Sequence, residues 1–375
     1  MGKEYLNISK TKLPSLLKKE CKWFFFCGSR SMGKTWAVHI HAVEEYLKNK
    51  RILIKIVRKN DDIKPTAEAL FDGVGPMYYP NLYPLIKTVG IFKMVYLCKK
   101  DEEGELIPIY GEETPFALVV SLRARNSLKT VSTTFSFIDR ETKKKLPLLF
   151  YFDEFQVEGN ADYLPDEVGA FLSVYQTINR DRVDSYGIFT SNSLSILCPL
   201  FSEFGIDKLL SDSPDLNYYY DSNKNYMIQR FNDDRFVNLS QDAALKAFEN
   251  HEYLKSSLNN EFLDSKTLIK NLDKLPYKRL LSFVSSENII YSIEIIKNDD
   301  FNGLYVSNRG KYDDTIVLSS SIKTHSFNTF YSGGRTSSIY INALRECFNG
   351  GESICFKDLK TKAAFVELIG YKNKK

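Results

Sequence analysis

The sequence predicts an α/β protein built around a parallel sheet flanked by helices. Apolar strand candidates alternate with helical patterns through the first half of the chain, which is typical of βαβ units. Two of these strands end in short polar motifs of the kind that bind nucleotides at a sheet edge. At 375 residues the chain is long enough for two domains, and the second half has a different order of short strands and helices.

Composition and charge exclude several classes of protein. Hydrophobic residues make up 43% and charged residues 26% of the chain, which is ordinary for a globular protein. No apolar run reaches the ~18 residues of a membrane span, and the amino-terminal residues lack an apolar signal core. The six cysteines form no C-x-x-C pair, so we expect a reduced compartment and no zinc site. A net charge of +4 means that any DNA contact depends on local basic patches.

The first polar motif is a glycine-rich loop between an apolar strand, Trp23–Phe26, and a helical pattern. Its residues are Gly28, Ser29, Arg30, Ser31, Met32, Gly33, Lys34 and Thr35. The glycines allow backbone N–H groups to point inward, and the helix start adds the positive end of its dipole. This pattern predicts a phosphate-binding loop for ATP, in which Lys34 contacts the phosphates and Thr35 offers a hydroxyl to Mg²⁺.

The second polar motif is a pair of acids, Asp153 and Glu154, at the end of a buried strand, residues 148–152. In a parallel sheet this strand end lies at the same edge as the loop. We expect Asp153 to hold Mg²⁺, directly or through water, and Glu154 to orient and deprotonate the attacking water. The acids alone are a weak signal, but together with the loop they predict an ATP-hydrolysing site.

The segment after the acids predicts a helix and one more strand. The helix begins near Pro165 and ends at Asn179, just before Arg180. An arginine there is either a cap that the helix dipole favours or a side chain that reaches the γ-phosphate of a neighbouring subunit. The strand that follows, residues 186–190, leads to Asn192, whose amide could sense the γ-phosphate or the attacking water.

The region between the two motifs is less regular. We expect strands at residues 51–57, 91–98, 106–110 and 116–122, with the middle two forming a hairpin, and irregular structure at residues 60–90. Three cations follow the last of these strands: Arg123, Arg125 and Lys129. They suit a solvated loop as well as a phosphate or DNA contact.

The order of these elements resembles that of the additional-strand P-loop (ASCE) ATPases. More closely, the chain resembles the DNA-packaging ATPases of phi29-type bacteriophages, which are reduced relatives of terminase large subunits. The residues that carry the resemblance are the loop 28–35, residues 152–155, residues 164–168 running to 179–182, and residues 190–192 followed by Pro199 and Phe201.

The resemblance implies an ATP-driven motor that moves double-stranded DNA into a procapsid. It implies a homo-oligomeric ring, a pentamer in the family, that docks on the portal in the host cell cytoplasm without a membrane, and it leaves a packaging RNA open. By position it implies that Lys34 and Thr35 bind phosphate and Mg²⁺, that Asp153 holds the metal and that Glu154 is catalytic. It implies that Arg180 acts in trans on the adjacent subunit's site. It also implies that Asn192 couples hydrolysis to movement and that Arg30 acts as a switch within the loop. Because residues 129–146 lengthen the chain relative to the family, a second trans-acting cation stays open among Arg123, Arg125 and Lys129.

The second half predicts a linker and a smaller domain. We expect a P-loop ATPase domain at 1–215, a linker at 216–280 with helices at 243–262 and 265–275, and an RNase H-like domain at 281–375. The elements expected in that last domain are strands at 289–296, 303–306 and 315–318, a helix at 337–348, a strand at 353–356 and a helix at 358–368.

A working nuclease of this type needs several carboxylates around two metals. The first expected strand offers only Glu294. Glu294, Asp299, Asp313 and Asp358 could be recruited as ligands, but all four are more typical of surface charges. We therefore expect a vestigial nuclease that serves docking. The alternatives are a full terminase large subunit with an active metal-dependent nuclease, and a nucleotide-binding switch without a motor, which the second acid disfavours.

Overall fold

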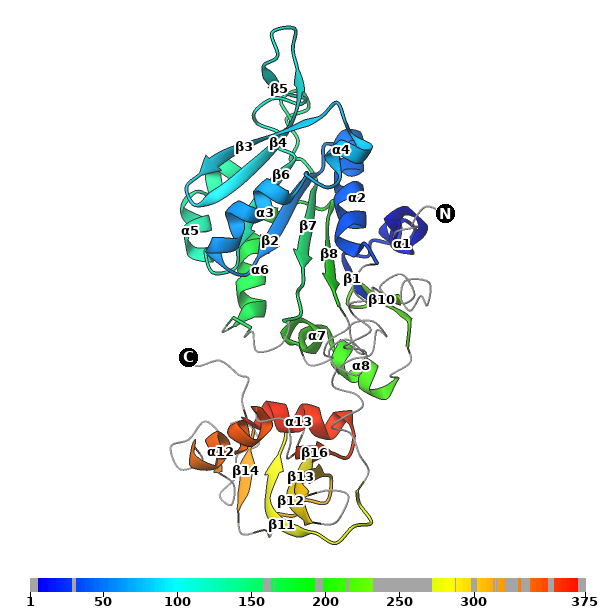
Figure 1. Ribbon diagram of the computed structural model, residues 1–375, viewed down its shortest axis with the longest axis vertical. Helices are drawn as coiled ribbons and strands as arrows, with labels where there is room; N and C mark the ends of the chain where they lie inside the picture. Colours follow the sequence, from blue (N-terminus) through cyan, green and yellow to red (C-terminus); the bar gives the residue numbers. More distant parts are fainter. Residues whose placement is uncertain are drawn as a thin grey trace, which may run out of the picture. The chain divides into compact units, whose positions relative to one another are not determined.

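The computed structural model divides into two compact units (Figure 1). It describes residues 6–28, 32–157, 163–164, 166–192, 198–213, 216–231, 272–286, 288–297, 302–312, 314, 316–320, 330–331, 338–349 and 354–369. Of these, residues 6–192 and 216–231 belong to the N-terminal unit, and residues 198–213 and 272–369 belong to the C-terminal unit.

The N-terminal unit contains a ten-stranded sheet. Its strands are β1 (Trp23–Gly28), β2 (Ile52–Val57), β3 (Tyr83–Val89), β4 (Phe92–Lys100), β5 (Leu106–Pro108), β6 (Ala117–Ser121), β7 (Leu148–Asp153), β8 (Ser185–Ser191), β9 (Tyr218–Asp221) and β10 (Tyr226–Phe231). They are ordered β3-β4-β6-β2-β7-β8-β1-β10-β9, and β5 pairs with β4. The centre, from β6 to β10, is parallel, as predicted, and antiparallel strands extend it at both ends, so the sheet is mixed.

Helices cover both faces of this sheet (Figure 1). They are η1 (Ile8–Lys10), α1 (Leu13–Leu17), α2 (Lys34–Asn49), η2 (Asn60–Asp62), α3 (Ile63–Ala69), α4 (Gly75–Tyr78), α5 (Arg125–Thr130), η3 (Ser132–Phe135) and α6 (Glu167–Asn179). Neighbouring side chains of a strand point to opposite faces. Trp23 of β1 packs edge-on against Tyr175 of α6, whereas Phe24 packs against Tyr186, whose hydroxyl lies 2.7 Å from Nε2 of His41 on α2. The helices α2 and α6 therefore lie on opposite faces.

The prediction of irregular structure at residues 60–90 is wrong. The segment forms η2, α3, α4 and β3. The helix α3 is short and carries Pro65, and β3 is an edge strand whose residues are half-buried or exposed. Neither element therefore has the apolar periodicity that marks a helix or strand in a sequence.

The last two strands of the N-terminal sheet come after residue 215, where we expected the first domain to end. The strand β10 pairs in parallel with β1, and β9 pairs with β10, so residues 218–231 complete this sheet. The two helices before them, α7 (Pro199–Phe204) and α8 (Ile206–Asp212), group with the C-terminal unit.

The C-terminal unit contains a six-stranded sheet. Its strands are β11 (Lys278–Val284), β12 (Ile290–Lys297), β13 (Asn302–Ser307), β14 (Val317–Ser319), β15 (Phe330–Tyr331) and β16 (Ile354–Phe356), in the order β15-β14-β11-β12-β13-β16. The strands β11 to β13 are antiparallel, and β14 is parallel to β11. The helices α12 (Ser338–Asn349) and α13 (Leu359–Ile369) contribute Leu344 and Phe365 to a core with Phe283 and Ile293.

The strand β11 corrects the sequence-based interpretation, which began this sheet at residue 289. The strand β11 lies inside the sheet and begins with Lys278 and Arg279. Only its last four residues are buried, so its first half lacks the apolar pattern by which a strand is predicted. Glu294 consequently lies on the second strand. Of the two predicted linker helices, residues 243–262 and 265–271 lie outside the described residues, and residues 272–275 have no helix. No helix in the described segments is both long and apolar enough to cross a membrane.

Candidate functional site

The glycine-rich loop connects β1 directly to α2. Residues 29–31, which include the predicted Arg30, lie outside the described segments. Gly33 has a φ of 76°, a left-handed conformation that glycine adopts without strain. A Cβ on Gly28 would meet the sulfur of the buried Met32 at 2.9 Å and the Phe231 carbonyl oxygen at 3.3 Å, so neighbouring atoms approach this residue closely. Gly33 therefore has a conformation that favours glycine, whereas Gly28 is the extended last residue of β1.

The Lys34 side chain is folded over the start of the loop. Its ammonium donates to the Gly28 carbonyl at 2.9 Å and to Oδ1 of Asn192 at 3.3 Å. Lys34 lies on α2 and Asn192 follows β8, which pairs with β1. The sheet thus brings together two residues that are 158 positions apart and that were both predicted to contact a γ-phosphate.

Asp153 lies at the carboxyl end of β7, between β2 and β8. Its Oδ2 accepts a hydrogen bond of 2.9 Å from the Thr35 hydroxyl, and its Oδ1 accepts one from the Thr190 hydroxyl. The backbone N–H of Glu154 also donates to Oδ1, at 3.1 Å. The two predicted metal ligands, Thr35 and Asp153, are therefore neighbours.

Lys55 is a site residue that the sequence reasoning missed. Its side chain is buried, its Nζ lies 3.4 Å from Oδ2 of Asp153, and it lies 3.8 Å from the ring centroid of Tyr151. Burial lowers the pKa of Lys55. Burial would raise the pKa of Asp153, but Lys55 and the donating hydroxyls outweigh it and lower that pKa to about 2. The available signal was a lone charge in an otherwise apolar strand, Ile52–Val57.

The donor set at Asp153 fits Mg²⁺. A hydroxyl and a carboxylate are hard oxygen ligands, and Mg²⁺ in nucleotide sites takes one or two protein oxygens and fills its shell with water and phosphate oxygens. The Thr35 hydroxyl and the Asp153 carboxylate supply those oxygens 2.9 Å apart, at the edge where α2 begins.

Glu154 is exposed and has an unusual backbone. Its φ is 49°, in the left-handed region that residues with a side chain rarely adopt. Its carbonyl accepts a hydrogen bond of 2.7 Å from Nη1 of Arg58. Arg58 follows β2 directly, and like Lys55 it was not among the predicted site residues.

Arg180 caps the far end of α6. Its φ is 43°, its Nε donates to the Thr177 carbonyl at 3.1 Å, and its own carbonyl accepts from Lys145. Arg182 is different, because it is buried and donates to the carbonyls of Leu146 and Ile178, both at 2.8 Å. Burial, with the nearby charge of Arg180, lowers the pKa of Arg182 to about 10. Arg182 therefore has a structural role. The position of Arg180 is compatible with a helix cap and with a side chain that reaches the γ-phosphate of a neighbouring subunit.

The three open cations lie around α5, where the sequence suggested a loop. Arg123 is exposed before the helix, and Lys129 is exposed near its end. Arg125 forms an ion pair of 3.4 Å with Asp166, the N-cap residue of α6. Nothing in this geometry singles out one of the three.

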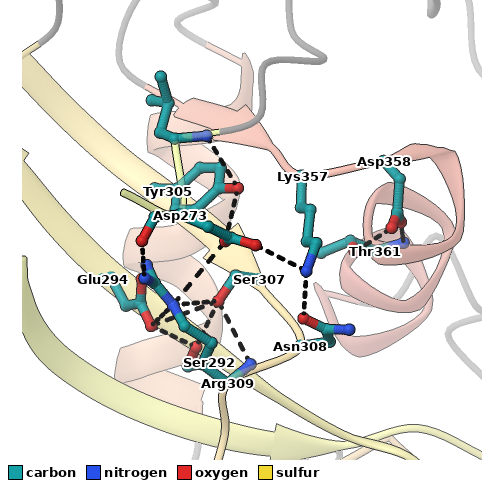
Figure 2. Close-up of polar contacts among 11 residues, drawn as sticks. Asp273, Ser292, Glu294, Tyr305, Ser307, Asn308, Arg309, Lys357, Asp358 and Thr361 are labelled. Atoms are coloured by element: carbon teal, nitrogen blue, oxygen red, sulfur yellow. Dashed lines mark hydrogen bonds and ion pairs between the residues drawn. The ribbon is translucent and has the colours of Figure 1, made fainter. Parts of the chain in front are cut away.

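The carboxylates of the C-terminal unit are engaged by cations and hydroxyls (Figure 2). The expectation that Glu294 is a surface charge is wrong, because its side chain is fully buried. It can be buried because Arg309 forms an ion pair with it and Ser292 donates to its Oε1 at 2.7 Å. Asp273 pairs with Lys357 at 2.7 Å.

Of the other acids considered from the sequence, the structure describes only Asp358. Asp358 accepts from the backbone N–H and hydroxyl of Thr361 at the start of α13. Asp299 and Asp313 lie outside the described residues. Within the segments that the structure describes, no three His, Cys, Asp or Glu side chains gather in a group that could hold a metal.

The fold and this site define an α/β protein with a lysine, two threonine hydroxyls and two acids at the carboxyl edge of its parallel strands. The chain belongs to the Podovirus DNA encapsidation protein (Gp16) family, whose model matches residues 136–325. The DNA packaging protein of Bacillus phage B103 is 24% identical over 314 residues, covering 80% of this chain and 85% of that protein.

Two solved structures share the fold over almost the whole chain. The bacteriophage Phi-29 genome packaging motor assembly matches with a TM-score of 0.55 and 18% identity, and the Phi-28 gp11 DNA packaging motor with a TM-score of 0.55 and 15% identity. Each match covers 96% of this chain and 98% of the other. The resemblance to phi29-type packaging proteins drawn from the sequence is thereby confirmed.

Proposed function

We propose that this protein is an ATP-driven motor that moves double-stranded viral DNA into a procapsid. One observation carries the proposal: Lys34 contacts Asn192 while Thr35 contacts Asp153, so the loop, the acids and the end of β8 meet at one sheet edge. Membership of a DNA encapsidation family supports the same conclusion. The N-terminal unit is then a P-loop ATPase of the additional-strand class.

The chemistry at this edge is positioning and charge neutralisation. Lys34 and the loop N–H groups would bind the phosphates of ATP, and Thr35 and Asp153 would hold Mg²⁺, which neutralises charge on the phosphates when bound. The exposed carboxylate of Glu154, next to Asp153, would orient a water molecule and accept its proton. Asn192 would contact the same phosphate as Lys34 and report its loss to β8.

Arg180 would act on the neighbouring subunit of a ring. It lies beyond the carboxyl end of α6, a helix of 13 residues and therefore about 20 Å long, whose first residue, Glu167, contacts Arg58 beside Glu154. Because the length of α6 separates Arg180 from Glu154 of the same chain, Arg180 would act in trans, in a homo-oligomeric ring that surrounds DNA. By family resemblance the ring is a pentamer docked on the portal in the host cytoplasm, with a packaging RNA left open as a partner.

The C-terminal unit would be an RNase H-like domain without a nuclease site. Three antiparallel strands followed by a parallel one support this fold. The first strand, β11, carries Ser282 at a buried position where a metal ligand would be expected, and Ser282 donates to Asp314, which also pairs with Arg279. Glu294 is neutralised by Arg309. The domain would therefore serve docking, and the full terminase alternative is not favoured.

The first experiment measures ATP hydrolysis with and without double-stranded DNA, together with the mass of the particle. The wild-type protein should hydrolyse ATP faster with DNA and should assemble into a ring. Glu154→Gln should keep nucleotide affinity and lose turnover. Arg140→Ala, which removes an exposed arginine paired with Glu113, is the matched control and should keep both. A slow, DNA-independent turnover by a monomer would instead identify a switch.

The second experiment tests the action of Arg180 in trans. Arg180→Ala subunits are mixed with Glu154→Gln subunits, each inactive alone. If the arginine reaches the neighbouring site, some interfaces in the mixed ring combine an intact Glu154 with an intact Arg180, and turnover returns. Mixtures as inactive as either parent would contradict the assignment.

A separate assay tests the terminase alternative. Metal-dependent cleavage of plasmid DNA by the full chain would support an active nuclease.

A further inference from the structure

Arg58 connects three elements next to the proposed catalytic acids. It follows β2, and its guanidinium forms hydrogen bonds with both carboxylate oxygens of Glu167, the first residue of α6, at distances of 3.0 to 3.2 Å. The same group donates to the carbonyls of Glu154, at 2.7 Å, and Phe155. Arg58 therefore contacts two successive backbone carbonyls, that of Glu154 and that of Phe155.

Glu167 holds this guanidinium in a fixed orientation. The Glu167 side chain is buried, with 1% of its surface exposed, and Arg58 is 15% exposed. The backbone N–H of Leu164 also donates to Glu167, at 3.0 Å. The planar, five-donor group of arginine can bind a carboxylate with one edge and backbone carbonyls with its remaining N–H groups, which a lysine cannot do.

The backbone that Arg58 contacts is strained. A left-handed conformation is unfavourable for a residue with a side chain, and such conformations persist where several contacts hold the backbone in place. At Glu154 the surroundings include the Arg58 hydrogen bonds to the Glu154 and Phe155 carbonyls, the hydrogen bond from the Glu154 N–H to Asp153, and that from the Phe155 N–H to the Thr190 carbonyl. The direction of the Glu154 side chain depends on this local conformation.

We infer that Arg58 is a positioning residue for Glu154. It holds the backbone of the acid in the left-handed conformation that directs its carboxylate, and it does so from a site that touches neither the phosphate loop nor the described metal ligands. This inference rests on the proposed function, in which Glu154 activates water. A misplacement of about 1 Å of such a group can cost about 100-fold in rate, whereas nucleotide binding depends on other residues.

The test compares Arg58→Met and Arg58→Lys with a control at the opposite end of the same strand. Arg51 precedes β2, is 7% exposed against 15% for Arg58, pairs with Glu45 at 2.8 Å and donates to the Asp184 carbonyl at 2.6 Å. Arg51→Met should therefore cost similar stability far from the acids. For each variant, kcat and KM for DNA-stimulated ATP hydrolysis are measured, with the affinity for a fluorescent ATP analogue and the midpoint of urea unfolding.

We expect kcat of Arg58→Met to fall about 10- to 100-fold while KM and analogue affinity stay within about 3-fold. Arg58→Lys should retain the ion pair with Glu167 and recover most of the unfolding midpoint, but not kcat, because one ammonium cannot reach both carbonyls. Arg51→Met should lower the midpoint of urea unfolding and leave kcat unchanged. A purely structural arginine would not produce a variant such as Arg58→Lys, in which kcat falls while the unfolding midpoint is largely recovered.

Two results would overturn the inference. If Arg58→Met does not fold, Arg58→Lys decides, and a kcat within about 2-fold of wild type would show that the backbone contacts do not matter for Glu154. Equal losses of kcat in Arg58→Met and Arg51→Met would assign both to stability. Wild-type protein without ATPase activity is a distinguishable failure, because it removes the proposed function and this inference with it.

Discussion

Replacing Lys55 with methionine should destabilise the N-terminal unit, because it leaves the Asp153 carboxylate without its nearest cation. The two side chains come from neighbouring strands, β2 and β7, and their charged atoms are 3.4 Å apart. Lys55 is 6% and Asp153 20% exposed, so solvent screens the pair only in part. Removing one partner of a buried pair typically costs about 3–5 kcal/mol.

Two values set the scale of the interaction. Two unit charges 3.4 Å apart attract by about 5 kcal/mol at an effective dielectric constant near 20. The fall of the Asp153 pKa from its ordinary 3.8 to about 2 is the net effect of burial, which raises the pKa, and of Lys55 and the two threonine hydroxyls, which lower it, and it corresponds to about 2 kcal/mol in favour of the charged form. That stabilisation is present above about pH 4 and is lost as the pH falls through 2. The coupling in a double-mutant cycle should therefore be about 2–5 kcal/mol.

The assay is urea unfolding of wild type, Lys55→Met, Asp153→Asn and the double variant, without nucleotide and with EDTA. Tryptophan fluorescence reports the N-terminal unit alone, because Trp23 and Trp36 are the two tryptophans of the chain. The double variant should be less destabilised than the sum of the single variants.

The matched control is the ion pair of Lys50 and Asp139, which is shorter at 2.7 Å but has Lys50 34% exposed. Solvent screening should limit its coupling to about 1 kcal/mol or less. If the Lys55–Asp153 cycle gave additive losses within about 0.5 kcal/mol, or no more coupling than the control, the side chains would not interact as the structure describes.

Two further predictions concern other buried groups. Burial lowers the pKa of His41 to about 4, so the unfolded chain takes up a proton first as the pH falls below 6.5, and stability should drop by about 2 kcal/mol between pH 7.5 and 5. His41→Gln should remove that part of the slope while a hydrogen bond to Tyr186 remains, and an unchanged slope in urea titrations would refute the assignment. Arg309→Met should cost the C-terminal unit about 3–5 kcal/mol by leaving Glu294 buried and unpaired. Adding Glu294→Gln should recover part of it, as judged by far-UV circular dichroism, and a double variant no more stable than the single one would argue against the pair.

The sequence alone determined the parts of the site that are local along the chain. A strand, a glycine-rich loop and a helix are consecutive, so the positions of Gly33, Lys34 and Thr35 could be predicted from spacing. The acids at the end of β7 could be predicted in the same way, because a buried strand places the residues after it at a sheet edge. The order of strands and helices in the C-terminal unit could be predicted in part for the same reason, although β11 was missed.

Only the tertiary structure decided which strands are neighbours. That β2 lies beside β7, with Lys55 opposite Tyr151 and Ile56 opposite Phe152, depends on pairing between segments about 100 residues apart. This pairing brings Lys55 to Asp153 and Arg58 to the backbone of Glu154. Strand pairing is selected by burial over the whole sheet, and no local pattern encodes it. The glycine-rich loop could therefore be predicted from the order of residues, whereas the two cations that contact Asp153 and the backbone of Glu154 could not.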